Sequence, residues 1–297
     1  MKYSLISLKY VMTIFLFAYV TSASAQDVFV FELEKNGEKY SIDEGINITK
    51  RTGYDNQPSF TPDGKAVLYT SQHGENYDIY EYVIATGITR NLTNTPKVNE
   101  YTPIANAANT HFTVVTENTM PDQSVWRYER ATGKAAWALS TKEGVGYYCF
   151  NRQGVCLIWL RYGNSVVLTN PASVDPARFI SGNALPSRPQ VVPSTEKFSF
   201  VHRQANDEVW IKQLDPKDYS ITPIAPVIPN RIDYCWTPDG VLLMGDGSKI
   251  FQWRPGKSTA WEQVEDLADQ GVQNITRLFF SPDSKKIALT GDDNLKN

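Results

Sequence analysis

One turn motif recurs along this chain and limits its possible folds more than any other feature. Its clearest copy runs from Pro58 to Gly64 and contains an aromatic residue followed by Thr-Pro-Asp-Gly. Close relatives occupy residues 236–240 and 280–284, and weaker copies align near residues 105, 150 and 191. The residues before the turns then fall at 60, 105, 150, 191, 236 and 280, which are 41 to 45 residues apart. This period is typical of a four-stranded β-propeller blade.

Each copy reads as strand, turn, strand, loop, strand, turn and strand. In the first copy, Pro-Asp-Gly predicts the tight turn, and apolar and polar residues alternate on both sides of it. The third strand provides an independent check on the alignment. Residues 124–128, 208–211 and 249–253 resemble residues 78–82, and residues 164–168 are a poorer copy.

The sixth copy stops near Gly291, after two strands, and the N-terminus supplies what it lacks. Residues 27–31 resemble a third strand, and residues 46–49 resemble the fourth-strand sequence at 90–93. Six units of about 44 residues need about 264 residues, and 272 follow position 25. We therefore predict an all-β, six-bladed β-propeller of four-stranded blades, formed by residues 26–297 as one domain. The alternative is a β-sandwich whose periodicity is accidental.

The first 25 residues have the layout of a secretory signal peptide. Lys2 and Lys9 precede the apolar run 10–20, and the small residues of 23–25 predict cleavage before Gln26. The apolar run is short for a membrane span, the alternative interpretation. We expect a periplasmic or secreted protein without membrane insertion. A net charge of −3 argues against nucleic-acid binding.

The motif from Pro58 to Gly64, with Asp78-Ile79-Tyr80 after it, resembles that of the TolB-like, WD-repeat-like propeller family. The resemblance extends over residues 27–291. It implies the fold, but one fold hosts many activities. Relatives include envelope proteins that bind partners, propellers attached to serine peptidases, and pectin-fragment lyases. This chain lacks the α/β domain of TolB itself, has no Gly-x-Ser-x-Gly sequence, and carries three histidines where the lyases cluster several.

Propellers usually bind ligands where the innermost strands begin, at the mouth of the central channel. The repeat alignment places a polar set there, which we predict as ligand-binding residues: Gln57, Glu100, Tyr101, Tyr147, Arg188, Asp233 and Arg277. Two guanidinium groups beside a carboxylate and phenols suit a carboxylated or sugar-like ligand. The alternative is a hydrated channel with internal ion pairs.

Other conspicuous residues favour structural roles. His73 and His202 fall in opposite blades and His111 at a strand start, so we predict no metal, no cofactor and no catalytic residue. Asp63, Asp239 and Asp283 repeat in the turns, where an aspartate stabilises the backbone.

The cysteines leave two alternatives. In the repeat alignment Cys149 lies opposite Cys156 on adjacent strands, which permits a disulfide in an exported protein. The alternative is two buried thiols that fill the core. Cys235 is expected to remain free.

We interpret the chain as a non-catalytic binding or scaffold module of the bacterial cell envelope that works as a monomer. Its expected partner is another envelope protein or a small polar ligand at the channel mouth. The alternative is a propeller hydrolase or lyase that acts on an extracellular carbohydrate or lactone.

Overall fold

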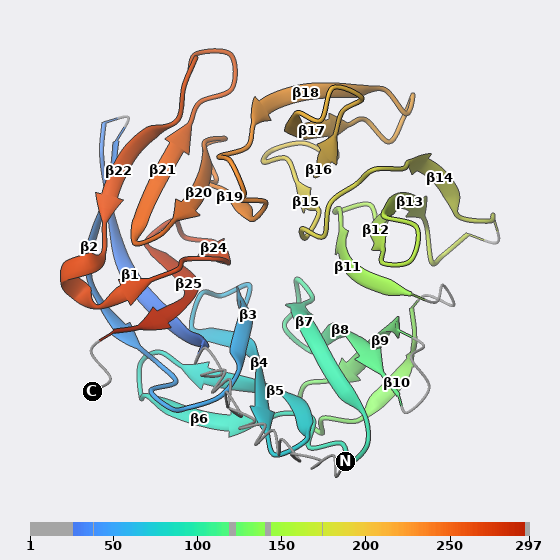
Figure 1. Cartoon of the computed structure of the whole chain (residues 1–297). Helices are drawn as coiled ribbons and strands as arrows, with labels where there is room; N and C mark the ends of the chain where they lie inside the picture. The colour runs from blue at the N-terminus through green and yellow to red at the C-terminus, as the bar shows by residue number, and fades with distance from the viewer. Residues whose placement is uncertain (1–25, 38, 119–122, 140–143, 174, 295–297) are drawn as a thin grey trace, which may run out of the picture.

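The computed structural model describes residues 26–37, 39–118, 123–139, 144–173 and 175–294. The predicted signal peptide lies outside these residues. The described strands form six sheets arranged around a central axis, with the innermost strand of each sheet at the centre (Figure 1).

The first three blades follow the chain from the centre outward. Blade one contains β3 (Asp55–Phe60), β4 (Ala66–His73), β5 (Asn76–Val83) and β6 (Ile88–Asn91). Blade two contains β7 (Asn99–Ala105), β8 (His111–Glu117), β9 (Gln123–Glu129) and β10 (Ala135–Ala138). Blade three contains β11 (Val145–Phe150), β12 (Cys156–Leu160), β13 (Ser165–Thr169) and β14 (Arg178–Ser181).

The last three blades complete the ring. Blade four contains β15 (Gln190–Val191), β16 (Phe198–Arg203), β17 (Val209–Leu214) and β18 (Ile221–Pro226). Blade five contains β19 (Tyr234–Trp236), β20 (Leu242–Asp246), β21 (Lys249–Trp253) and β22 (Glu262–Asp266). Blade six contains β23 (Val272–Gln273), β24 (Leu278–Phe280), β25 (Lys286–Asp293), β1 (Gln26–Asn36) and β2 (Lys39–Asn47).

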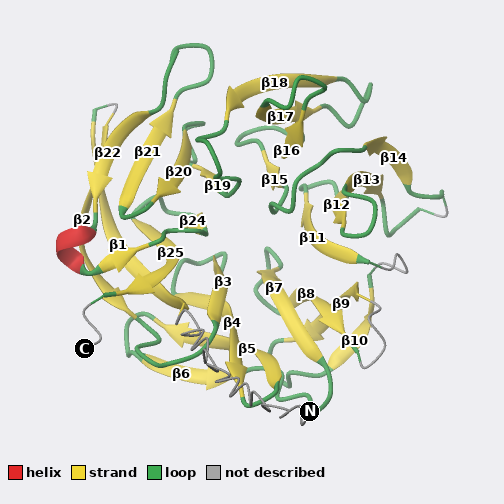
Figure 2. Ribbon diagram, viewed as in Figure 1, coloured by secondary structure: helices red, strands yellow, loops and turns green. Residues whose placement is uncertain are grey.

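Almost the whole described chain is strand and loop (Figure 2). The exception is a single 3-10 turn, η1 (Ala268–Gln270). Within the part of the chain that the structure describes, no helix has the length and apolar character needed to cross a membrane.

The repeat alignment is confirmed strand by strand. In every blade, the strand nearest the axis ends at the residue that the alignment placed before the turn, from Phe60 in β3 to Phe280 in β24. All hydrogen-bonded strand pairs within the blades are antiparallel, as short turns between successive strands require.

The N-terminal strand closes the ring, as predicted. Phe29 of β1 pairs with Leu289 of β25 on one side and with Asn47 of β2 on the other. The predicted fourth strand, 46–49, was placed too late, because β2 begins at Lys39 and ends at Asn47. Residue 49 follows the strand and ties it down: the Thr49 hydroxyl accepts a hydrogen bond from the Val28 amide and donates one to Asp27.

The core lies between blades and follows from strand alternation. Leu68 of β4 packs toward blade two with Phe112 and Val114, whereas its neighbours Val67 and Tyr69 pack toward blade six. Successive side chains of a strand point to opposite faces, so each sheet contributes one apolar face to each neighbour. The blades are therefore held by contacts around the ring, and the residues at the axis are left to line a channel.

Candidate ligand-binding channel

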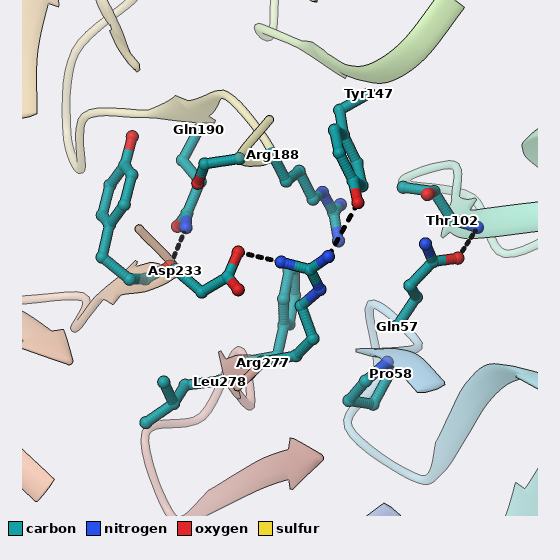
Figure 3. A pocket seen from close by; sticks show the side chains of 12 residues that line it. Gln57, Pro58, Thr102, Tyr147, Arg188, Gln190, Asp233, Arg277 and Leu278 are labelled. Carbon is teal, nitrogen blue, oxygen red and sulfur yellow. Dashed lines mark hydrogen bonds and ion pairs between the residues drawn. The ribbon is translucent and has the colours of Figure 1, made fainter. Parts of the chain in front are cut away.

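All six blades contribute polar residues to a narrow cavity on the axis, which we call the neck (Figure 3). The neck has a volume of about 30 Å³, enough for one or two water-sized groups. Five predicted ligand-binding residues line it: Gln57, Tyr147, Arg188, Asp233 and Arg277. The repeat alignment therefore identified side chains from blades one, three, four, five and six that meet in space.

Arg277 is the centre of this arrangement. One of its guanidinium nitrogens, Nη1, forms an ion pair with Asp233, and the other, Nη2, donates to the Tyr147 hydroxyl at 2.7 Å. Burial lowers the pKa of Arg277, but the Asp233 carboxylate together with Tyr147 and Tyr54 outweighs burial and raises that pKa above its ordinary value. Arg277 is therefore a permanent cation with a matched anion, which agrees with the internal ion pair foreseen as the alternative to ligand binding.

Arg188 has no such match. Its guanidinium carbon lies 4.6 Å from the centre of the Phe279 ring, and its Nε is buried without a hydrogen-bond partner. No carboxylate among the described residues forms an ion pair with it. Burial lowers the pKa of Arg188, and the nearby charge of Arg277 adds to that effect. Arginine keeps its charge even so, and the residues lining the neck therefore hold two cations and one anion.

Two glutamines tie neighbouring blades together around the neck. The Gln57 side-chain oxygen accepts hydrogen bonds from the Thr102 amide at 2.8 Å and from the Thr70 hydroxyl. Gln190 donates from its side-chain nitrogen to the Tyr234 carbonyl of blade five, and its side-chain oxygen accepts a hydrogen bond from the Trp236 amide at 3.4 Å. The Gln57 side-chain oxygen is thus occupied in bracing blade one against blade two, whereas its side-chain nitrogen makes no hydrogen bond to the described residues.

Glu100 does not reach the channel, although its neighbour Tyr101 does. The Glu100 side chain is fully buried between blades one and two, where it contacts the hydroxyls of Thr93, Thr95 and Tyr128. Burial, with help from the charge of Asp78, raises the pKa of Glu100 to about 8. The prediction of Glu100 as a channel residue is wrong because consecutive strand residues point to opposite faces.

A wider cavity, which we call the mouth, opens from the neck on the face where the innermost strands begin. Its volume is about 450 Å³. Gln57 and Tyr147 line both the neck and the mouth, so the two cavities adjoin each other. The mouth is lined by aromatic rings and by polar groups from blades one to three: Tyr54, Tyr101, Tyr147, Trp159, Glu117, Gln123 and Arg161.

Sequence reasoning missed most of the mouth. Glu117, Gln123, Trp159 and Arg161 belong to second and third strands or follow them, whereas only first-strand positions were considered. Charged residues at the ends of second strands were the available signal. Glu117 accepts a hydrogen bond from Gln123 at 3.0 Å and lies 3.9 Å from an Arg161 nitrogen, so the mouth balances its own charges.

Gly146 makes room for the aromatic wall of the mouth. A Cβ at this position would lie 2.3 Å from the Trp159 ring. Trp159 is held by a hydrogen bond from its indole nitrogen to the Ala184 carbonyl and lies 5.8 Å from the Tyr147 ring. Any larger residue at 146 would displace the indole and change the shape of the mouth.

A third cavity, the turn-face chamber, lies at the other end of the neck. Its volume is about 330 Å³, and it shares Arg188, Gln190 and Phe279 with the neck. Its walls are mostly apolar: Ile104, Cys149, Phe150, Val191, Trp236, Phe279, Phe280 and four prolines. The channel thus has a polar end, a charged constriction and an apolar end.

The turn aspartates are structural, as predicted. Asp63, Asp239 and Asp283 each accept a hydrogen bond of 2.6–2.7 Å from the Thr or Ser two residues earlier. Burial works against ionisation of Asp239, but hydrogen bonds from Lys35, Tyr40 and Thr237 hold its pKa at about 2.

The histidines do not meet in the channel. His73 stacks on Tyr80 within blade one, His111 contacts Thr110 in blade two, and His202 lies in blade four. Across the described residues, no three side chains of His, Cys, Asp and Glu are placed together to hold a metal ion.

The proposed disulfide between Cys149 and Cys156 is wrong, because the strand register differs by one residue. Cys149 pairs with Leu157, and Cys156 pairs with Phe150. The two thiols consequently point to opposite faces of blade three, where Cys149 packs toward blade four and Cys156 toward blade two. All three cysteines are free and buried, and burial raises the pKa of the Cys149 thiol to about 12.

Comparisons with known proteins were informative at the level of structure alone. No family model matches the chain, and no curated protein matches it in sequence. Among solved structures, TolB from Acinetobacter baumannii has a TM-score of 0.59 at 11% identity, over 90% of this chain but only 64% of that protein. A TolB candidate from Agrobacterium tumefaciens has a TM-score of 0.67 at 12% identity, over 90% of this chain and 98% of that one.

An enzyme appears among the similar structures as well. A gluconolactonase from Xanthomonas campestris has a TM-score of 0.63 at 9% identity, over 88% of this chain and 94% of that one. TolB proteins and a gluconolactonase thus share this architecture, and identities this low speak to the fold alone. The chain is a six-bladed β-propeller with the fold of the TolB-like propellers.

Proposed function

We propose that this protein is a non-catalytic binding or scaffold module of the bacterial cell envelope, exported by a signal peptide at residues 1–25. Its ligand or partner segment binds at the mouth of the channel, and the protein works as a monomer. The observation that carries the proposal is the mouth itself: a cavity of about 450 Å³ on the face where propellers usually bind ligands.

The chemistry of the mouth supports recognition of a polar group with flat or apolar parts. Tyr54, Tyr101, Tyr147 and Trp159 supply rings, whose hydroxyl and indole groups combine apolar area with hydrogen bonding. Glu117, Gln123 and Arg161 supply charge and hydrogen bonds that can fix orientation. A few placed polar groups in a largely aromatic cavity are typical of ligand sites.

A pull-down with matched variants tests the proposal. The mature protein (residues 26–297) is immobilised and exposed to an envelope extract, beside Arg161→Glu in the mouth and Arg203→Glu, a half-exposed arginine that does not line the mouth. We expect Arg203→Glu to recover a defined partner as the wild type does, and Arg161→Glu to recover at least tenfold less of it. The reason is that Arg161→Glu places a second carboxylate beside Glu117.

The same material separates binding from catalysis. Purified mature protein is assayed against aldonolactones and acidic oligosaccharides, with metal content measured on the same sample. A turnover that Arg161→Glu abolishes while Arg203→Glu retains it would replace the binding module with the propeller hydrolase or lyase. Equal partner recovery by both variants would remove the mouth as the binding surface.

A further inference from the structure

The turn-face chamber contains one polar side chain that the fold leaves without a partner. Thr237 and Ser281 donate to Asp239 and Asp283, and Gln190 is bonded to the backbone of blade five. Arg188 alone among the polar side chains at its walls has no hydrogen bond or ion pair within the described chain, and its Nε is buried.

The Arg188 side chain is partly buried, and its Nε has lost water without gaining a hydrogen-bond acceptor, which is unfavourable. Asp233 does not compensate for it, since that carboxylate is paired with Arg277. The mouth offers no spare carboxylate either, since Glu117 is held by Gln123 and Arg161. One positive charge therefore remains uncompensated at the junction between the neck and the chamber.

The space around Arg188 limits what can supply the missing anion. The neck, at about 30 Å³, holds a head group but no more. The chamber below it, at about 330 Å³, is walled by Phe150, Val191 and Trp236 and reaches the solvent between the turns. Its size lies within the range of small-molecule sites.

We propose that the turn-face chamber binds an amphipathic monocarboxylate, with its carboxylate against Arg188 and its apolar body among the rings of the chamber. The planar guanidinium matches the two oxygens of a carboxylate. The Phe279 ring, 4.6 Å from the guanidinium carbon, keeps that group at the inner end of the chamber. This site is separate from the mouth, and the proposal does not depend on the function proposed for the mouth.

Calorimetric titration of the mature protein with octanoate tests the site, beside octanol, acetate and chloride. Octanol has the apolar body without the charge, whereas acetate and chloride have the charge without the body. We expect octanoate to bind about tenfold or more tightly than any of the three, since a hydrogen bond to a charged group contributes roughly that factor. Comparable binding of octanol, acetate or chloride, or no binding of octanoate, would overturn the proposal.

Three variants locate the site. Arg188→Gln should reduce octanoate affinity to that of octanol, and Arg203→Gln, at a half-exposed arginine that lines neither the chamber nor the mouth, should leave it unchanged. Val191→Phe fills the chamber without touching the charge, so it should weaken octanoate at least tenfold. Should Arg188→Gln fail to fold, Val191→Phe decides the question: unchanged octanoate affinity in that variant refutes the chamber as the site.

Discussion

Glu100 makes the stability of this propeller depend on pH in a direction opposite to that of most carboxylates. Its carboxyl group is fully buried and has a pKa of about 8, whereas an exposed glutamate in the unfolded chain has a pKa of about 4.5. The folded protein therefore holds a proton that the unfolded chain releases. The contribution of Glu100 to the free energy of unfolding is fully present below pH 4.5 and is lost as the pH rises toward 8.

The hydrogen-bond network explains why a proton belongs there. The Thr93 hydroxyl lies 3.2 Å from Glu100 and 3.3 Å from Asp78, and it accepts a bond from the Ile79 amide. It has one proton to donate and cannot satisfy both carboxylates. A protonated Glu100 donates to Thr93, which frees the Thr93 proton for Asp78.

The magnitude follows from the two pKa values. Each pKa unit corresponds to about 1.4 kcal/mol, so the free energy of unfolding falls by about 3 kcal/mol between pH 4.5 and pH 7, and by about 5 kcal/mol by pH 9, because the unfolded chain releases this proton first. Glu100→Gln keeps the shape, and its amide N–H can donate to Thr93 as the protonated acid does. We therefore expect the variant to gain about 3 kcal/mol of unfolding free energy over the wild type between pH 4.5 and pH 7.

Denaturant unfolding at intervals from pH 4.5 to 9 measures this difference. Glu34→Gln, an exposed position on β1, is the matched control and should run parallel to the wild type. The difference between Glu100→Gln and wild type should rise by about 1.4 kcal/mol per pH unit between pH 5 and 8. A constant difference across that range would refute the argument that Glu100 is protonated in the fold.

Three further outcomes are expected. Deleting residues 26–50 removes β1 and β2 and exposes β25, so the truncated protein should melt at a lower temperature or aggregate; an unchanged cooperative melt would rule out ring closure by the N-terminus. Asp63→Ala and Asp283→Ala should lower the melting temperature without changing affinity for the ligand of the mouth, because their carboxylates bond only within their turns; loss of that binding in either variant would rule out the mouth as its site. Alkylation after unfolding without reductant should label Cys149, Cys156 and Cys235, as mass spectrometry will show, and a single labelled cysteine would restore the disulfide.

The fold was predictable because each blade repeats the same local pattern of strand and turn residues. The turn motif ending at Gly64 recurs at nearly constant spacing, and strand pairing needs only neighbouring segments of the chain. Even ring closure could be recognised, since residues 27–31 resemble 78–82. The structure repeats the likeness in detail: the Thr49 hydroxyl caps Val28 as the Thr93 hydroxyl caps Ile79.

Errors arose wherever a one-residue change in register decides the outcome. The pairing of β7 with β8 shifts register between Tyr101 and Ile104, where Thr102 has a positive φ. The sequence does not reveal this shift, so it does not show which side chains on either side of it face the channel. The Cys149 prediction failed for a related reason. The turn after β11 keeps Asn151 to Val155 out of the ladder, which pairs Cys156 with Phe150 and sends the two thiols to opposite faces.

The charge of the channel illustrates a limit of a different kind. Alignment brought Arg188, Asp233 and Arg277 to one level of the axis, but it could not say which arginine the single carboxylate would take. In the ring, Arg277 and Asp233 belong to adjacent blades, and Tyr147 holds the far side of the Arg277 guanidinium from across the channel. Arg188 is left facing Phe279 at the apolar end. The excess charge is therefore a property of the closed ring: each blade supplies one side chain, and only their arrangement around the axis decides which of them remains available to a ligand.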